Sequence, residues 1–177
     1  SPVTQAENMN FSEKGVEEAL RKNIMMMGNI YSFYALYAEE GAEARTDSEN
    51  VLDKWIIASL NRLVVTVSKA MSEYDLPKAM RPITDFIDEL STWYIRRSRE
   101  RFKADDENDK KRALATTKHV LIELSKVMAP FVPFVAEASW QKVTGNNFGS
   151  KDKSVHLELW SKAQSVDDSV LSDMETV

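Results

Sequence analysis

Apolar side chains recur at steps of three and four residues along most of this chain, and this spacing restricts it to helices that pack through one face. Long stripes of this kind cover residues 13–40, 52–74 and 80–94, and shorter ones cover 114–128 and 133–143. The period is that of an amphipathic α-helix, whose apolar face must be buried against a neighbour. We therefore predict an all-α fold, an antiparallel bundle of four to five helices.

The few glycines and prolines separate these stripes. The chain has five of each among its 177 residues. Pro77 and Pro133 stand where helices are expected to begin, and Gly41 and Gly145 stand just past expected helix ends, which is the usual asymmetry of the two residue types. Residues 46–49 also fit a capping box in front of the second stripe.

The C-terminal part follows a different pattern. Val155, Leu157 and Leu159 alternate with polar residues, which predicts a short extended segment. An acidic stretch follows it. We expect residues 1–160 to form the helical bundle and residues 161–177 to form a flexible acidic tail.

Composition excludes several kinds of site. The chain has no cysteine and two histidines, which rules out thiolate zinc sites and cysteine nucleophiles, so we expect no metal site and no catalytic residue. No stretch reaches the roughly 20 apolar residues of a membrane span, and residues 1–5 lack the features of a signal peptide. We expect a cytoplasmic protein that does not contact a membrane.

One basic segment stands out in a chain whose net charge is −5. Residues 93–103 contain five basic side chains and one acidic one, interleaved with aromatic residues. Such a segment can bind RNA phosphates while a ring stacks on an unpaired base. The alternative is a solvated basic helix end that complements the helix dipole.

A helical wheel divides these residues into two groups. Arg97 and Arg101 continue the apolar stripe, so we expect them to form structural ion pairs, because an unpaired buried guanidinium is costly. A different face carries the cations that are free to meet phosphates, with an aromatic residue for stacking between the two faces. The predicted RNA-binding residues of this segment are Arg96, Arg99, Lys103 and Trp93.

The ordered motifs of the chain resemble the anticodon-binding domain of class I isoleucyl-tRNA synthetases, over nearly the whole length. The pieces that carry the resemblance are Ser1-Pro2-Val3, the run from Phe11 to Val16, Asn29-Ile30-Tyr31-Ser32-Phe33-Tyr34, Leu52-Asp53-Lys54-Trp55-Ile56, the run from Trp93 to Arg99, Met128-Ala129-Pro130-Phe131 and Ser154-Val155-His156-Leu157. The run Trp-Tyr-Ile-Arg-Arg-Ser-Arg and the run Ser-Val-His-Leu point to the isoleucyl branch.

This resemblance implies a function in translation. The chain would bind the anticodon stem-loop of tRNA(Ile), with Asn29 as a further polar contact from the first helix, and would contact the remaining domains of a parent synthetase. The parent would join isoleucine to tRNA with ATP and magnesium. Since the catalytic signatures of the family are missing here, the resemblance implies a monomeric fragment with no cofactor of its own.

A protein-interaction bundle without RNA binding is the alternative function. In that case the acidic loop at 39–49 and the methionine-rich stretch at 25–27 would contact another polypeptide. Binding of the anticodon stem-loop separates the two hypotheses.

Overall fold

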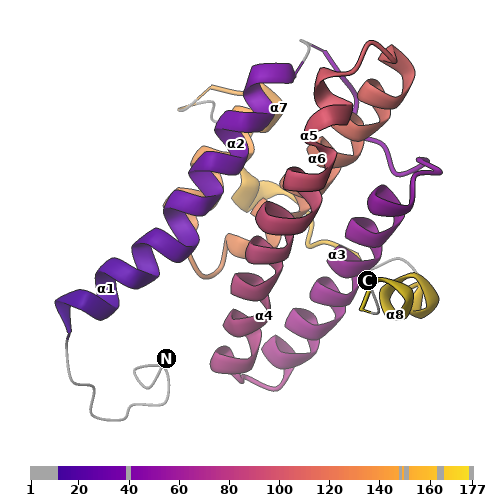
Figure 1. Ribbon diagram of the computed structural model, residues 1–177. Coiled ribbons are helices and arrows are strands. Elements are labelled where there is room, and N and C mark those ends of the chain that lie inside the picture. The colour runs from indigo at the N-terminus through magenta and orange to yellow at the C-terminus, as the bar shows by residue number, and fades with distance from the viewer. Residues whose placement is uncertain (1–11, 39–40, 148, 150–151, 163–165, 176–177) are drawn as a thin grey trace.

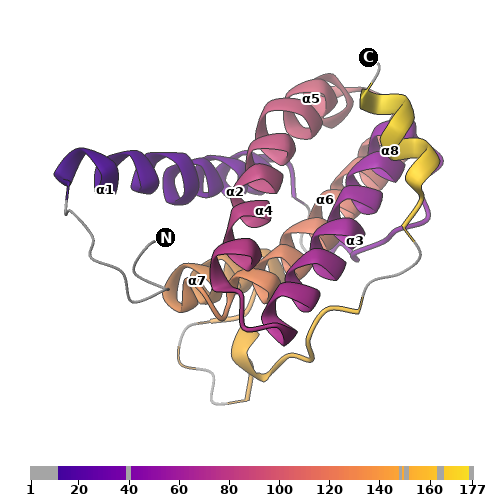
Figure 2. The same ribbon diagram turned by 90° about the horizontal axis from the view of Figure 1, so that it is seen from below.

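The structure is a computed structural model that describes residues 12–38, 41–147, 149, 152–162 and 166–175. Long helices run side by side, as Figures 1 and 2 show, and no strand occurs within these ranges. The predicted all-α fold is therefore confirmed. Residues 1–11, which carry the motif Ser1-Pro2-Val3 and the start of the Phe11 motif, lie outside the described part, as do residues 39–40 of the acidic loop.

The first rod of the bundle consists of three successive helical pieces. Helix α1 (Glu13–Ala19) leads into a π-helical turn, η2 (Leu20–Met25), and then into α2 (Met26–Tyr37). Among the described side chains of this rod, the buried ones lie in α2 and are Met27, Ile30, Tyr31 and Tyr34, whereas the ribbon of α1 extends away from the other helices (Figure 1). The predicted helix is present, with a π-helical turn in its middle.

Helices α3 (Val51–Ser72) and α4 (Leu76–Glu89) form an antiparallel hairpin. The side chain of Asp75 caps α4 by accepting from the backbone N–H of Lys78, 3.1 Å away, and Pro77 lies in the first turn as predicted. The expected capping box at residues 46–49 is wrong. Asn50 caps α3 instead, by accepting a 2.9 Å hydrogen bond from the Leu52 backbone N–H.

A second π-helical turn, η3 (Leu90–Ile95), joins α4 to α5 (Arg96–Lys103) in one continuous rod. A π turn contains one residue more than an α turn, so it rotates everything that follows by about 100° relative to an uninterrupted α-helix. After the turn, Ile95, Ser98 and Phe102 face the core. The apolar stripe of α5 is therefore displaced by one residue from the predicted one.

Helices α6 (Glu107–Met128) and α7 (Pro133–Thr144) complete the bundle. Asp106 caps α6, and α6 stops before Pro130 as its sequence predicts. Gly145 follows α7 with a φ of 74°, a left-handed conformation that glycine adopts without strain. The largest fully buried side chains are Tyr94, Phe102, Met27, Ile30, Ile56, Leu60, Ile87, Leu90, Leu121, Leu124, Val67 and Val120.

The C-terminal part differs from the expected extended segment and from the expected flexible tail. Residues Val155–Leu157 form a 3₁₀ turn, η4, rather than an extended segment, and only Val155 of the three alternating apolar residues is buried. Helix α8 (Asp168–Glu175) lies within the range expected to be a flexible tail, and it packs against α3 with Leu171 buried. No helix in the described ranges is both long and apolar enough to cross a membrane.

Candidate nucleic-acid interface

Helix α5 presents three cations on one exposed side, which we call the basic face: Arg96, Arg99 and Lys103. They lie within about 60° of one another around the helix axis, beside the flank that buries Ile95 and Phe102. Within the described residues, none of the three forms an ion pair with a carboxylate. The structure thus gives the predicted phosphate-binding residues the exposure and the free charge that such contacts require.

Aromatic rings from α2 and α5 support the basic face from below. The ring centroid of Phe33 lies 5.4 Å from that of Phe102, and Tyr37 stacks on Phe102 at 6.1 Å. The guanidinium carbon of Arg99 lies 5.7 Å from the Phe33 centroid, within the range of a cation–π contact. The side chain of Arg99 is therefore positioned at the junction of α2 and α5.

Asn29 lies on α2, one helical turn before Phe33, and its side chain is exposed. Residues four apart share one face of a helix, so Asn29 is on the side of α2 that carries the contact with Arg99. This polar side chain could extend the basic face across two helices.

Arg97 occupies a place different from the one expected. Its guanidinium carbon lies 3.9 Å from the centroid of the Trp93 ring, and its side chain is exposed rather than buried on the core side. The π turn explains the difference, because the added residue moves Arg97 off the core side. Trp93 is half-buried against Trp55, with 6.3 Å between the ring centroids. Because the Arg97 guanidinium covers one face of the Trp93 ring, that face is not open to a base.

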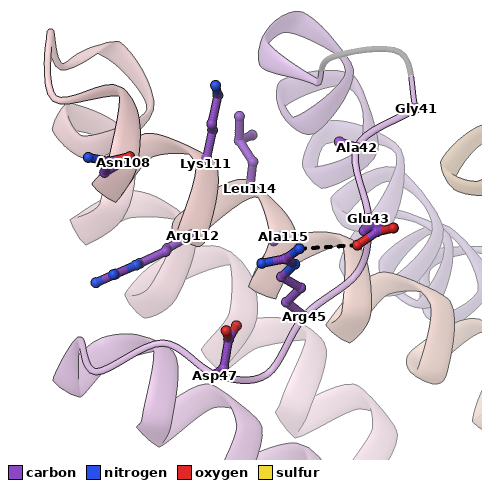
Figure 3. A pocket seen from close by; sticks show the side chains of 10 residues that line it. All are labelled: Gly41, Ala42, Glu43, Arg45, Asp47, Asn108, Lys111, Arg112, Leu114 and Ala115. Atoms are coloured by element: carbon purple, nitrogen blue, oxygen red, sulfur yellow. Dashed lines mark hydrogen bonds and ion pairs between the residues drawn. The ribbon is translucent and has the colours of Figure 1, made fainter.

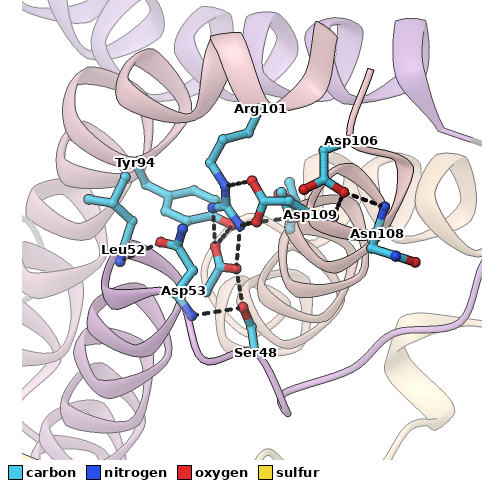
Figure 4. A network of polar contacts seen from close by, with 11 residues as sticks. Ser48, Leu52, Asp53, Tyr94, Arg101, Asp106, Asn108 and Asp109 are labelled. Carbon is cyan, nitrogen blue, oxygen red and sulfur yellow. Dashed lines mark hydrogen bonds and ion pairs between the residues drawn. The ribbon is translucent and has the colours of Figure 1, made fainter. Parts of the chain in front are cut away.

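Arg101 does form ion pairs, within a buried polar network (Figure 4). Its guanidinium donates to both oxygens of Asp53, at 2.8 and 2.9 Å, and to both oxygens of Asp109, at 2.8 and 2.7 Å. Asp53 is fully buried, and it also accepts hydrogen bonds from the hydroxyls of Tyr94 and Ser48. The network joins α3, η3, α5 and α6.

The pKa shifts of Arg101 and Asp109 favour the charged forms of both side chains. Burial by itself lowers the pKa of Arg101, but the hydrogen bonds to Asp53 and Asp109 outweigh it, so the pKa lies above its ordinary value. The hydrogen bonds from Arg101 also lower the pKa of Asp109. Burial, together with the charge of Asp53, raises the pKa of Tyr94 well above its ordinary value, which keeps this hydroxyl a donor. The network thus fixes the orientation of α5, and with it the direction of the basic face.

A hollow of about 560 Å³ lies beyond the end of α5, between the 41–47 segment and the first turns of α6 (Figure 3). Its cations are Arg45, Lys111 and Arg112, of which Arg45 pairs with Glu43 at 3.2 Å. Lys111 and Arg112 have no ion pair to any residue that the structure describes, and their side chains point in different directions from α6. These two cations are not among the residues predicted from the sequence, although the run Lys110-Lys111-Arg112 is a visible basic signal.

Comparisons with known proteins agree with this architecture. Residues 53–177 match the family model described as the anticodon-binding domain of tRNA ligase. An isoleucine--tRNA ligase of Chlamydia trachomatis serovar D is 42% identical over 162 residues, which are 89% of this chain and 15% of that protein. An isoleucine--tRNA ligase of Clostridium novyi is 43% identical over 156 residues, which are 85% of this chain and 15% of that protein.

One solved structure shares the fold. The crystal structure of the ternary complex of Agrobacterium radiobacter K84 agnB2 LeuRS-tRNA-LeuAMS matches with a TM-score of 0.56 at 18% sequence identity, covering 92% of this chain and 18% of that one. The chain spans about 15% of the length of the curated relatives it matches. By its sequence family and its helical architecture, this chain belongs to the anticodon-binding domains of tRNA ligases.

Proposed function

We propose that this chain binds the anticodon stem-loop of tRNA(Ile) as part of an isoleucine--tRNA ligase. The relatives named above are isoleucine--tRNA ligases, and the family to which the chain belongs is defined by anticodon binding. The whole protein would attach isoleucine to its tRNA in the cytoplasm with ATP and magnesium. The catalytic and editing steps would belong to its other domains, and this chain, a monomer, would supply RNA binding alone.

The basic face is the observation that carries this proposal. Arg96, Arg99 and Lys103 are exposed on one side of α5, and they lack carboxylate partners among the described residues. Cations of this kind bind RNA phosphates and release counterions, which gives most of the affinity and makes it depend on salt. Lys111 and Arg112, on the next helix, could extend the same phosphate-binding surface toward the hollow.

Asn29 and Trp93 have separate roles in the proposal. Asn29, exposed on α2, would offer its amide to a base edge or a sugar. Trp93 would act through the guanidinium that covers its ring, because that face is closed to direct stacking.

The proposal is tested by the affinity of the chain for the anticodon stem-loop of tRNA(Ile), measured at several salt concentrations. The double variant Arg96→Ala, Arg99→Ala should bind more weakly, and its log–log salt slope should be shallower by about one unit for each lost phosphate contact. The matched control is Lys69→Ala, Arg81→Ala, which removes the same charge from exposed positions on α3 and α4. Arg81 lies about 22 Å from Arg96 along the same rod.

Two outcomes would count against the proposal. One is equal affinity and equal slope in the α5 variant and the control variant, which would favour a protein-interaction bundle. The other is equal affinity of the wild-type chain for the isoleucine and the methionine stem-loops, which would contradict the assignment to tRNA(Ile).

A further inference from the structure

We propose that a groove between α3, α5 and α8 binds one unpaired RNA base, stacked on the outer face of the Arg97 guanidinium. This proposal rests on the proposed function, since it assigns a second contact to the same RNA. It concerns a surface that lies on the opposite flank of α5 from Arg99 and Lys103.

The groove has the shape and lining of a small ligand site. Its volume is about 630 Å³, within the range of pockets that enclose small organic groups. Its walls come from the first turn of α3, from α5 and from α8. The lining residues are Val51, Leu52, Arg97, Val170, Asp173 and Met174. Four of these six are apolar, Arg97 is the cation among them and Asp173 is the acid.

Arg97 is already held in the conformation that stacking requires. Its guanidinium lies 3.9 Å above the Trp93 ring, and Trp93 is itself fixed by Trp55. One face of the planar guanidinium is therefore covered, while the side chain as a whole remains exposed and lines the groove. Because the side chain is ordered before binding, little conformational entropy remains to be lost when a second flat group stacks on it.

A flat aromatic group without a charge of its own fits this groove best, because the lining contains one cation, Arg97, and one acid, Asp173. Unpaired RNA bases stack on arginine planes, and the guanidinium is hydrated weakly enough to make that contact favourable. The walls formed by Val51 and Met174 suit the apolar faces and edges of a base. An apolar helix of a partner protein would gain nothing from a cation in the wall.

The basic face supplies the phosphate that accompanies the base. Arg96 directly precedes Arg97, so their Cα atoms are about 3.8 Å apart and their side chains point to different flanks of α5. An RNA strand that crosses α5 could therefore place a phosphate on Arg96 and the neighbouring base on Arg97.

The test uses Arg97→Lys, which keeps the charge but loses the plane. We expect its affinity for the anticodon stem-loop of tRNA(Ile) to fall about tenfold, with an unchanged salt slope. Arg81→Lys, at an exposed position on α4 outside the basic face and the groove, is the matched control and should bind within about twofold of wild type. Both positions are exposed, so equal thermal midpoints are expected and would exclude a folding defect.

Two further measurements locate the base. Val51→Glu places an acid in the groove at the first position of α3, where a negative charge favours the helix, and it should weaken binding as Arg97→Lys does. A stem-loop that carries 4-thiouridine in the loop should photo-crosslink to the 51–52 and 170–174 segments of wild type and lose these crosslinks in Arg97→Lys.

The results separate this inference from the proposed function. Wild-type affinity in Arg97→Lys and Val51→Glu, or crosslinks confined to other segments, would overturn the inference while the Arg96→Ala, Arg99→Ala result still supports RNA binding. If wild type does not bind the stem-loop at all, both proposals fail.

Discussion

Arg101 donates a hydrogen bond to each oxygen of the Asp53 carboxylate, at 2.8 and 2.9 Å, across 48 residues of sequence. Asp53 is fully buried, and the hydroxyls of Tyr94 and Ser48 donate to the same carboxylate. Four donors thus compensate one buried negative charge, which is the condition under which such a charge is tolerated. The pair fixes the start of α3 against α5, and the direction of the basic face depends on it.

The first prediction concerns this pair. Asp53→Asn keeps the shape of the side chain but presents an amide N–H₂ toward donors, and it leaves Arg101 with Asp109 as its remaining carboxylate. We expect the free energy of unfolding to fall by about 3 kcal/mol, measured by urea denaturation. The control, Glu43→Gln, breaks an exposed pair with Arg45 and should change stability by less than about 0.5 kcal/mol. Similar losses in both variants would contradict this account of the network.

Helix ends were predictable where the signal was local. Pro77 at the start of α4 and Gly145 after α7 act through their own backbone geometry, so sequence alone identified these boundaries. The cap of α3 was different, because residues 46–50 offer several capable side chains. Ser48 donates to Asp53 in the structure, and Asn50 is the residue that caps the helix.

The candidate site was predictable on one flank of α5 only. An α-helical wheel placed Arg96, Arg99 and Lys103 together, and they do share a face. The same wheel placed Arg97 with the core, because no pattern in the sequence predicts the π turn at Leu90–Ile95. That turn is selected by tertiary packing, which buries Ile87 before it and Phe102 after it on two different registers.

The second prediction concerns the cap of α6. The Asp106 carboxylate accepts from the backbone N–H groups of Asn108 and Asp109, at 3.1 and 3.3 Å. Asp106→Ala should lower the free energy of unfolding by about 1 kcal/mol, because two N–H groups at the helix start lose their acceptor. Asp105→Ala is the control, since it removes an equal charge from the adjacent exposed position. A loss in the control as large as in Asp106→Ala would refute the capping role.

The third prediction concerns alkaline pH. Burial raises the pKa of Tyr34 from 10.0 to about 12. The Tyr34 phenol therefore ionises at a lower pH in the unfolded chain than in the folded one. Its stabilising contribution to the free energy of unfolding is complete below pH 10 and is lost as the pH rises from 10 through 12. Between pH 9 and pH 11 this phenol alone should account for a loss of about 1 kcal/mol.

Tyr34→Phe should remove that part of the alkaline loss. It should have little effect at pH 8, because no described group forms a hydrogen bond with the Tyr34 hydroxyl. Urea denaturation of wild type and variant at pH 8, 9 and 11 measures the difference. Tyr74→Phe, whose ring is 92% exposed, is the control and should follow wild type. If Tyr34→Phe also follows wild type at every pH, buried ionisation is not the cause.

The fourth prediction concerns the segment that carries the Ser-Val-His-Leu motif. Alternation of apolar and polar residues suggested an extended strand there, but the structure holds the segment through a contact with α7. One oxygen of Glu137 accepts from the hydroxyl of Ser154 at 2.8 Å and from the backbone N–H of Val155 at 2.9 Å. Such a long-range acceptor leaves no mark on the local sequence, which is why the 3₁₀ turn was not predictable.

Glu137→Ala should therefore release this turn without unfolding the bundle. Hydrogen bonds to a charged acceptor contribute about 1.5–3 kcal/mol, so the Val155 amide should exchange with solvent roughly 30-fold faster, measured by hydrogen exchange with NMR detection. Amides in the middle of α3 and α6 should keep more of their protection, because their exchange needs a larger opening. Asp152→Ala, which removes an exposed acid two residues before Ser154, is the matched control and should leave Val155 unchanged. Wild-type exchange at Val155 in Glu137→Ala would show that core packing of the Val155 side chain, not the carboxylate, holds the segment in place.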